Sequence, residues 1–396
     1  MRGSAAFRTG VAPGGALAPA WVRDALWSNA QAVPSLDLRF ADNKSLTDAT
    51  TGANLVTFTR ASSGTYVGSD GVLRTAANDV PRFDHNPTTG KSLGLLVEEQ
   101  RTNLLLQSDS FATSWGITAG VTVTSLGQVG PLGLNATRFT YNASPSQPGP
   151  YQVVSTISGT VYTASFWVRG VSSFPSSLNV VFNDGATYVP VTSSWQRVSA
   201  QITASVTGSV GFRIDRFPTS NAVYEIAGMQ LEAGAFPTSY IPTTTTALTR
   251  SADVASITGT NFSSWYRQSE GALLAMYSAS TSGPYSSLNK IANFQPVSIG
   301  SYGAIAINSG AQTGWFASGN GRPVSATAYF INKQSIAYIG TQWASAANGL
   351  ISVSNSSDYA GTSTSLAIGG GAVAISRLTY WPTRLADTTL QQITQP

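Results

Sequence analysis

The sequence predicts an all-β protein built from two antiparallel sandwiches, and three of its properties support this prediction. Charged residues make up only 10% of the 396 residues and hydrophobic ones 42%, a globular composition without the Glu- and Lys-rich surface of exposed helices. Thr, Val, Tyr and Phe recur throughout, and these side chains pack well on a pleated strand. Short alternating stretches separated by turn-forming residues follow one another at intervals of roughly 8–15 residues, which is typical of a sandwich or jelly roll.

The chain is long enough for more than one hydrophobic core, because a domain usually has about 100–200 residues. Residues 1–35 are rich in Ala, Gly and Pro and contain Trp21 and Trp27. A short amphipathic turn or helix is expected around these tryptophans. An apolar segment without a domain of its own is either a docking peptide or a disordered tail, and the two large aromatic side chains favour docking.

Composition also excludes several classes of function. The net charge of +4 is spread along the chain without a run of Lys and Arg, so neither nucleic acid nor an anionic membrane is an expected partner. The absence of cysteine excludes disulfides, thiolate metal sites and a cysteine nucleophile. We find neither a secretory signal nor an apolar stretch long enough to span a membrane, so we expect synthesis in a cytoplasm and no membrane insertion.

Catalytic chemistry has little support. A retaining glycoside hydrolase needs two carboxyl groups about 5–5.5 Å apart, which a strand provides at alternate positions. The only adjacent acidic pair is Glu98 and Glu99, whose side chains point to opposite faces of a strand. We therefore predict one exposed and one structural carboxylate here, and no catalytic residue.

Histidine and metal chemistry are equally restricted. The single histidine, His85, lies beside turn-forming residues and is expected to be a turn residue and not a base. We predict no metal site and no cofactor. Calcium stays an open alternative, because loop residues such as Asn183 and Asp184 carry oxygen ligands.

Sugar binding needs flat aromatic faces and planar polar groups that pair with hydroxyls. Period-two alternation along residues 162–169, 195–202 and 211–215 turns one set of such side chains away from the core. These glycan-binding candidates are Trp167, Arg169, Trp195, Arg197, Arg213 and Asp215. We expect the three strands to present them on one sheet surface, with packing at the core edge or assembly contacts as the alternative.

Four phrases of the sequence are specific in combination. They are Phe58 to Tyr66, Val97 to Leu104, Gly228 to Pro242 and Ile375 to Leu385. Together they resemble phage and prophage structural proteins, in which a jelly-roll module similar to carbohydrate-binding modules accompanies a concanavalin A-like, laminin G-like sandwich. The resemblance covers about residues 36–396.

This resemblance implies a domain arrangement. The first and last strands of concanavalin A-like sandwiches are commonly neighbours, so residues 36–107 and 244–396 are expected to form one sandwich. The jelly roll at 108–243 would then be inserted into it, an arrangement that is tolerated where chain ends lie close together. Three consecutive pieces are the alternative.

The resemblance also implies a function and partners. It places the chain on a virion surface, as a head spike, head fibre or tail fibre, and implies a homo-oligomer, usually a trimer. We expect anchoring to other virion proteins through residues 1–35, with Trp21 and Trp27 in contact, and weak adhesion to host surface polysaccharide strengthened by many copies. The alternatives are a purely architectural protein and, with less support, a polysaccharide depolymerase.

Overall fold

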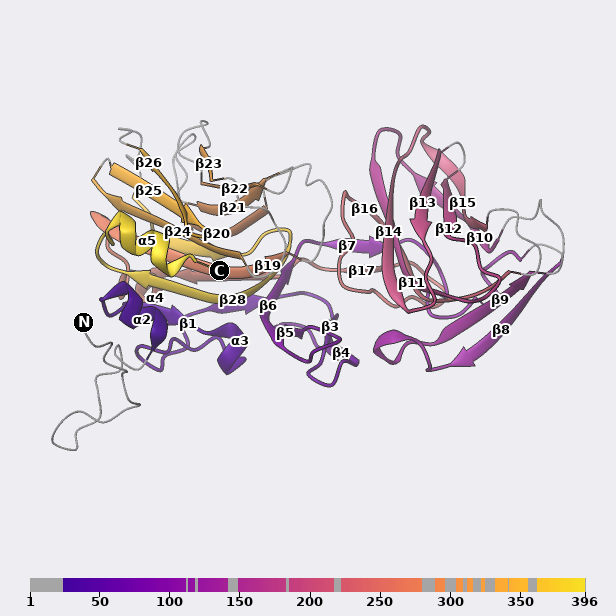
Figure 1. Ribbon diagram of the computed structural model, residues 1–396, viewed down its shortest axis with the longest axis horizontal. Coiled ribbons are helices and arrows are strands. Elements are labelled where there is room, and N and C mark those ends of the chain that lie inside the picture. Colours follow the sequence, from indigo (N-terminus) through magenta and orange to yellow (C-terminus); the bar gives the residue numbers. More distant parts are fainter. Residues whose placement is uncertain are drawn as a thin grey trace, which may run out of the picture.

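The computed structural model describes residues 24–111, 113–117, 120–141, 149–182, 185–216, 222–279, 289–295, 304–308, 312–315, 322–324, 332–340, 342–354 and 362–395. Strands account for 53% of the structure and helices for 8%, so the predicted all-β class is confirmed. The strands form two lobes joined by a narrow waist (Figure 1). We call them the large sandwich and the jelly roll.

The large sandwich has one sheet in the order β26-β25-β24-β19-β28-β6-β5, and β1 also pairs with β28. All of the pairs are antiparallel. Its strands are β1 (Leu36–Leu38), β5 (Arg82–His85), β6 (Ser92–Glu98), β19 (Glu270–Ala279), β24 (Asn332–Ile339), β25 (Gln342–Ala347), β26 (Leu350–Ser354) and β28 (Ala372–Trp381).

The facing sheet has the order β2-β18-β27-β20-β21-β22-β23. Its strands are β2 (Thr57–Thr59), β18 (Val254–Thr258), β20 (Asn289–Gln295), β21 (Ala304–Asn308), β22 (Gln312–Trp315), β23 (Arg322–Val324) and β27 (Ser365–Ile368). Both sheets combine strands that precede the jelly roll in the chain with strands that follow it. This sandwich therefore needs both chain segments to form its core.

The jelly roll lies between those segments in the chain and also has two sheets. The sheet that faces the large sandwich, which we call the cleft sheet, has the order β14-β11-β16-β9-β8, and the other, the outer sheet, has the order β10-β15-β12-β13. The strands are β8 (Val121–Gly127), β9 (Ala136–Tyr141), β10 (Tyr151–Thr156), β11 (Val161–Ser172), β12 (Ser177–Phe182), β13 (Gly185–Pro190), β14 (Gln196–Thr203), β15 (Gly208–Arg216) and β16 (Val223–Ala233).

Alternation decides which side chains fill the jelly-roll core. In β14 the buried Val198, Ala200 and Ile202 alternate with more exposed residues, as the sequence predicts. Strand β11 differs, because both of its faces are buried: Phe166 lies in the core and the neighbouring Trp167 is buried on the opposite face. The cleft sheet therefore has no fully solvated side along β11.

The junction between the lobes is built from short elements. These are the hairpin of β3 (Gly64–Val67) and β4 (Leu73–Ala76) and the pair of β7 (Arg101–Asn103) and β17 (Leu248–Arg250), which crosses the waist in Figure 1. Residues 234–243, which lead out of the jelly roll, fold back over the cleft sheet. There Gln230 Oε1 accepts a hydrogen bond from the Ile241 N–H at 2.6 Å, and the Thr238 N–H donates to Glu232 at 3.0 Å.

The N-terminal helix α2 (Ala25–Ala30) packs on its own sandwich, close to the C-terminal helix α5 (Asp387–Ile393) (Figure 1). Asp24 caps α2 by accepting from the Trp27 N–H at 3.1 Å. Trp27 is only 5% exposed and its indole donates to Asp37 at 3.1 Å. This corrects the expectation for Trp27: its ring stabilises the sandwich and does not face a partner. Trp21 lies outside the described residues.

The remaining helices are short: α3 (Phe40–Asn43), α4 (Gly259–Ser263) and the 3-10 turn η1 (Pro131–Gly133). The C-terminal helix α5 buries Leu390 and Ile393, and Ala386 occupies its N-terminal capping position. Among the helices described, none is both long and apolar enough to cross a membrane.

Candidate functional site

The six predicted glycan-binding residues do not share one surface. Trp167 and Arg169 lie on β11 and Arg197 on β14, all in the cleft sheet, with Trp195 just before β14. Arg213 and Asp215 lie on β15, which pairs with β10 and β12 in the outer sheet. The expectation of a single surface is therefore wrong, because period-two alternation fixes the face of each strand but not the sheet that the strand joins.

Trp167 is part of the packing between the two lobes. It is 8% exposed and belongs to a cluster with Leu134, Ala227 and Tyr240. The guanidinium carbon of Arg197 lies 4.8 Å from the centroid of the Trp167 ring, and the Tyr240 ring meets it edge-on at 6.2 Å. The indole therefore offers no open face on which a sugar ring could stack.

Trp195 and Arg169 lie farther along the same face. The guanidinium of Arg169 is 4.9 Å from the Trp195 ring centroid, and its Nε donates to Glu225 at 2.7 Å. Arg138 pairs with the other oxygen of Glu225 at 2.6 Å. Arg138 and Arg169 thus share the single carboxylate of Glu225, and the partly buried Trp195 has one face under an arginine.

The outer sheet carries a different set of side chains toward solvent. Tyr151 on β10 is 44% exposed and Tyr188 on β13 is 56% exposed. Between these edge strands, Arg213 Nε donates to Asp215 at 2.7 Å, and the Oδ1 atom of Asn179 has no hydrogen-bond partner among the described residues. We call these five residues the outer-sheet patch.

Strand register places the members of the outer-sheet patch in two rows. Tyr151 is the cross-strand partner of Arg213, and in the next row Asp215 pairs with Asn179, which pairs with Tyr188. With strands about 4.8 Å apart and about 3.4 Å per residue along each, the two tyrosines are about 16 Å from each other. That separation matches the length of a short oligosaccharide laid across the sheet.

Tyr151 is held in place by its surroundings. The backbone N–H groups of Tyr151 and Gly116 donate to each other's carbonyl oxygens at 3.0 and 2.9 Å. A Cβ atom at Gly116 would overlap the Tyr151 ring, so the ring lies directly against the glycine backbone. One face of the ring is thus fixed on the protein, which lowers the entropy cost of binding a ligand on the exposed side.

Neither tyrosine is among the residues predicted from the sequence. In β10 the apolar residues fall on both faces, because Tyr151 and Val153 point outward while Val154 points inward with Gln152. Gln152 is buried and its amide exchanges hydrogen bonds with the backbone of Leu106 at 3.0 and 2.7 Å. Because Gln152 is polar but points inward, a prediction based on alternating polarity does not place Tyr151 on the outer face.

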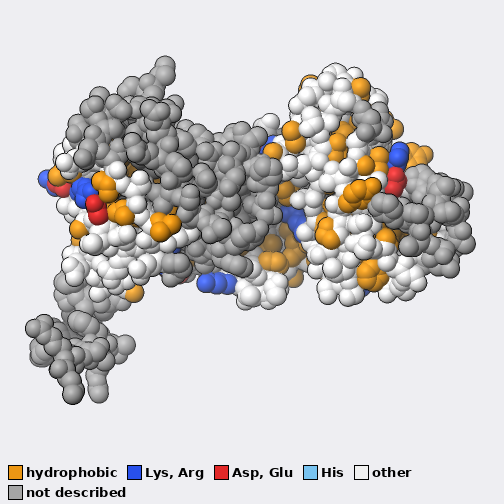
Figure 2. All heavy atoms as spheres, turned by 45° about the horizontal axis from the view of Figure 1, so that its top comes forward, with side chains coloured by type: hydrophobic (Ala, Val, Ile, Leu, Met, Phe, Trp, Pro, Cys, Tyr) orange, Lys and Arg blue, Asp and Glu red, His pale blue; other side chains and the backbone are white. Residues whose placement is uncertain are grey.

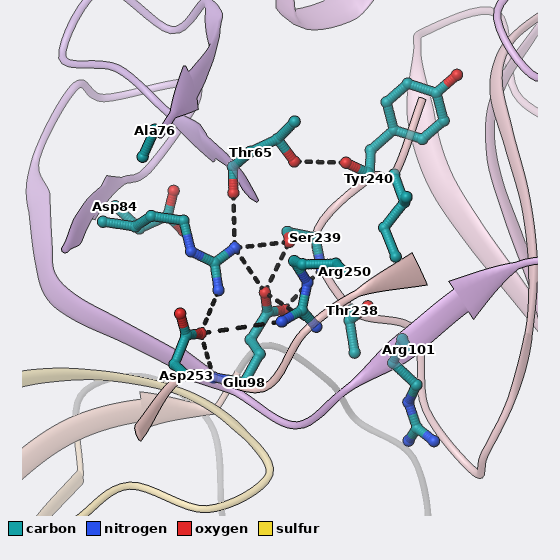
Figure 3. A network of polar contacts seen from close by, with 12 residues as sticks. Thr65, Ala76, Asp84, Glu98, Arg101, Thr238, Ser239, Tyr240, Arg250 and Asp253 are labelled. Atoms are coloured by element: carbon teal, nitrogen blue, oxygen red, sulfur yellow. Dashed lines mark hydrogen bonds and ion pairs between the residues drawn. The ribbon is translucent and has the colours of Figure 1, made fainter. Parts of the chain in front are cut away.

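A buried ion network lies at the junction of the lobes (Figure 3). Arg82 pairs with Glu98 at 2.8 Å and also contacts Asp253, and Arg60 pairs with Asp253 at 3.0 Å. Arg250 lies 3.6 Å from Glu98. Three guanidinium groups thus share two carboxylates, and all five side chains are at most 2% exposed.

Glu98 is structural in this network, while the neighbouring Glu99 is 42% exposed, which confirms the prediction for this pair. The two carboxylate oxygens of Glu98 also accept hydrogen bonds from the Ser239 N–H at 2.7 Å and the Ser239 Oγ at 2.6 Å. Burial alone would raise the pKa of Glu98, but Arg250, Arg82 and Ser239 outweigh it and lower the pKa to about 2. A carboxylate so fully engaged is poorly suited to attack a substrate.

His85 does not lie in the turn that the sequence predicts. It is the last residue of β5 and is 6% exposed, and its Nδ1 lies 2.9 Å from the carbonyl oxygen of Val67. Across the described part of the chain, no group of three or more His, Asp and Glu side chains could hold a metal ion. Asn183 and Asp184 lie outside the described residues.

Comparisons with known proteins add little about function. No family model matches the chain, and no curated protein matches its sequence. One similar solved structure is the CBM22-1 xylan-binding domain of Paenibacillus barcinonensis Xyn10C, with 16% identity, coverage of 33% of this chain and 92% of that chain, and a TM-score of 0.27. The tandem CBM22-1–CBM22-2 domain of the same protein has 10% identity, coverage of 70% of this chain and 97% of that chain, and a TM-score of 0.28. The CBM40 of a Ruminococcus gnavus sialidase, bound to α2,3-sialyllactose, has 13% identity, coverage of 33% of this chain and 84% of that chain, and a TM-score of 0.27. Because these TM-scores lie below 0.5, the likenesses do not bear on function.

Proposed function

We propose that the protein is a non-catalytic glycan-binding protein that uses the outer-sheet patch as its binding surface. The observation that carries this proposal is the pair of exposed tyrosines, Tyr151 and Tyr188, on opposite edge strands with Arg213, Asp215 and Asn179 between them. Aromatic faces stack on the apolar side of a sugar ring, while the polar groups pair with its hydroxyls. Two exposed rings with polar groups between them suit weak binding along a polysaccharide.

A purely binding role agrees with the state of the carboxylates. Asp84 and Glu98 line one pocket, and their pKa values differ, about 6 for Asp84 and about 2 for Glu98, as they would in an acid and base pair. Glu98, however, is closed in by Arg82 and Ser239 and is 2% exposed. This favours a structural role for the pair over depolymerase chemistry.

We further propose that the protein acts on the surface of a phage particle, as a spike or fibre. The support is the resemblance of its four sequence phrases to phage structural proteins. A homo-oligomer, in the resemblance a trimer, would place several outer-sheet patches on one particle, and multivalency would raise weak single-site binding to useful avidity. Residues 1–35, apart from the buried Trp27, would supply the attachment to other virion proteins.

A glycan array probed with the full chain coupled to multivalent beads tests the binding proposal. We expect retention on one class of host surface polysaccharide, and Tyr151→Ala and Tyr188→Ala each to weaken binding about two- to tenfold, since an aromatic contact contributes about 0.5–1.5 kcal/mol. Val254→Ala, which truncates a 56% exposed side chain on the large sandwich, is the control and should change nothing.

Two outcomes would decide against this proposal. Absence of binding to every glycan by the multivalent protein would favour a purely architectural role. Release of reducing ends from a bound polysaccharide, abolished in Asp84→Asn, would instead identify a depolymerase.

A further inference from the structure

A pocket of about 300 Å³ lies between the large sandwich and the cleft sheet of the jelly roll. The large sandwich contributes residues of the β3–β4 hairpin and of β5 and β6, and the jelly roll contributes Trp167, Arg197 and residues 238–240. Figure 2 shows hydrophobic side chains gathered where the two lobes meet. The pocket lies on the opposite sheet of the jelly roll from the outer-sheet patch, so it is independent of the proposed sugar site.

The walls of the pocket are largely hydrocarbon. Leu73, Leu93, Leu96 and Leu132 line it together with the ring of Tyr66. Such walls exclude water and favour a ligand with an apolar body over a sugar, whose hydroxyls would be left without partners.

Arg197 is the exposed cation of this pocket. One of its terminal nitrogens donates to Ser165 Oγ at 3.1 Å and to the Thr238 carbonyl oxygen at 2.8 Å. Among the described residues, no carboxylate lies within ion-pair distance of its guanidinium. Protein surrounds the group closely enough for desolvation to lower the pKa of Arg197, with Glu232, Glu98 and Asp84 only partly opposing this. A cation in this position is stabilised by an anion that enters the pocket.

The charges around the pocket are of both signs. Behind the pocket wall, three guanidinium groups share two carboxylates, as described above, which leaves one positive charge unmatched in that network, while Glu232, Glu98 and Asp84 act on Arg197 itself. Asp84 also lines the pocket, and burial raises its pKa to about 6 despite a hydrogen bond from the Val67 N–H at 2.7 Å. Below that pH the Asp84 side chain no longer opposes the positive field.

His85 adds a polar group to the same pocket. Its Nδ1 faces a carbonyl oxygen, and its buried Nε2 has no hydrogen-bond partner among the described residues. Because Nδ1 donates to that carbonyl oxygen, Nε2 of the neutral ring is an acceptor, and a hydrogen-bond donor on a ligand or a water would satisfy it.

We propose that this pocket is a binding site for a small organic carboxylate with an apolar body, whose carboxylate pairs with the Arg197 guanidinium while its body fills the leucine-lined space. The planar guanidinium can donate two parallel hydrogen bonds to a carboxylate, and such charged bonds are among the strongest that proteins make. An amide of the same shape keeps the apolar contacts but loses the ion pair.

Isothermal titration of the full chain with 1-naphthaleneacetate and with 1-naphthaleneacetamide tests this assignment, because the two probes share one apolar body and only the first carries a charged carboxylate. The titration is run at pH 5.5 and at pH 8, since Asp84 titrates between these values and is surrounded by Arg82, Glu98, His85 and Arg197. At pH 5.5 we expect the carboxylate to bind at least about tenfold more tightly than the amide. At pH 8 the preference should shrink.

Three variants complete the test, each checked for an unchanged thermal unfolding transition. Arg197→Gln should remove the preference for the carboxylate, Arg197→Lys should keep part of it, and Leu73→Trp should block both probes by filling the pocket. Equal binding of the two probes, an undiminished preference in Arg197→Gln, or no saturable binding of either probe would overturn the proposal. None of these results depends on whether the outer-sheet patch binds sugar.

Discussion

The two sheets of the jelly roll place similar side chains in opposite situations. On the cleft sheet, Trp167 and Trp195 each lie beneath a guanidinium, and residues 234–243 cover the polar groups next to them. On the outer sheet, Tyr151 and Tyr188 are about half exposed with polar groups between them. A side chain that points away from the core of its own sandwich is therefore not always exposed. Whether the outer face of a sheet is free to bind a ligand or is buried in an interface depends on what packs against that sheet.

Covering the cleft sheet buries polar groups, and each buried polar group needs a hydrogen-bond partner. Thr163 donates to the Gly234 carbonyl oxygen at 2.7 Å, and Glu232 accepts from the backbone and side chain of Thr238 at 3.0 and 2.8 Å. Such satisfied groups fix one arrangement of the covering segment. The following experiments test the contrast between a structural and a binding face.

The largest effect is expected in the ion network beside the cleft. Asp253→Ala leaves Arg60 and Arg82 without one of the two shared carboxylates, and we expect a loss of about 3–5 kcal/mol in the free energy of unfolding. Urea denaturation measures it. Arg74→Ala, which breaks the exposed pair with Asp70, is the matched control and should cost less than about 1 kcal/mol. Similar losses in both variants would show that the network does not stabilise the junction.

The next comparison separates the two sheets directly. Trp167→Ala removes a buried ring and should cost about 3 kcal/mol of stability without weakening glycan binding. Tyr188→Ala removes an exposed ring and should change stability by less than about 0.5 kcal/mol while weakening glycan binding. Thermal unfolding and the glycan array report the two quantities. A destabilised Tyr188→Ala protein, or a Trp167→Ala protein that loses only glycan binding, would reverse the assignment.

Acid should loosen the cleft through Glu98. Its pKa is about 2 in the folded protein against 4.5 ordinarily, so its contribution is fully present above pH 4.5 and is lost as the pH falls toward 2. The difference corresponds to about 3 kcal/mol. Denaturation midpoints between pH 5 and pH 2 should fall less in Glu98→Gln, which has already lost this contribution, and equal slopes would contradict the prediction.

The smallest effect is expected for Asp84, whose contribution to stability changes with pH in the opposite direction to that of Glu98. Burial raises the pKa of Asp84 from 3.8 to about 6, so the folded state holds its proton more tightly and loses stability as the pH rises from about 4 through 6. Asp84→Asn should remove this dependence and be more stable than the parent by about 3 kcal/mol at pH 8. Unfolding curves at pH 4 and pH 8 test it, and a parent that gains stability across this range relative to the variant would be inconsistent with a buried carboxyl group.

Local patterns account for the parts that could be predicted. The all-β class follows from strand-forming composition and alternation, and the inward positions of Val198, Ala200 and Ile202 follow from the two-residue repeat of β14. That one of Glu98 and Glu99 is structural and the other exposed was also predictable, since adjacent strand residues point to opposite faces, but which of the two is structural was not. The partners of Glu98 were not predictable either, because Asp253 is 155 residues from the Glu98 backbone N–H that donates to it.

In strands such as β14 the sequence by itself determined which side chains leave the core, because alternation is a property of each strand and needs no knowledge of its neighbours. Only the tertiary structure decided that β15 joins the sheet away from Trp167, and that the large sandwich and residues 234–243 cover the cleft sheet. Strand pairing and the docking of two lobes depend on contacts between distant parts of the chain. For that reason Tyr151 and Tyr188, and the pocket around Arg197, came into view only in the folded protein.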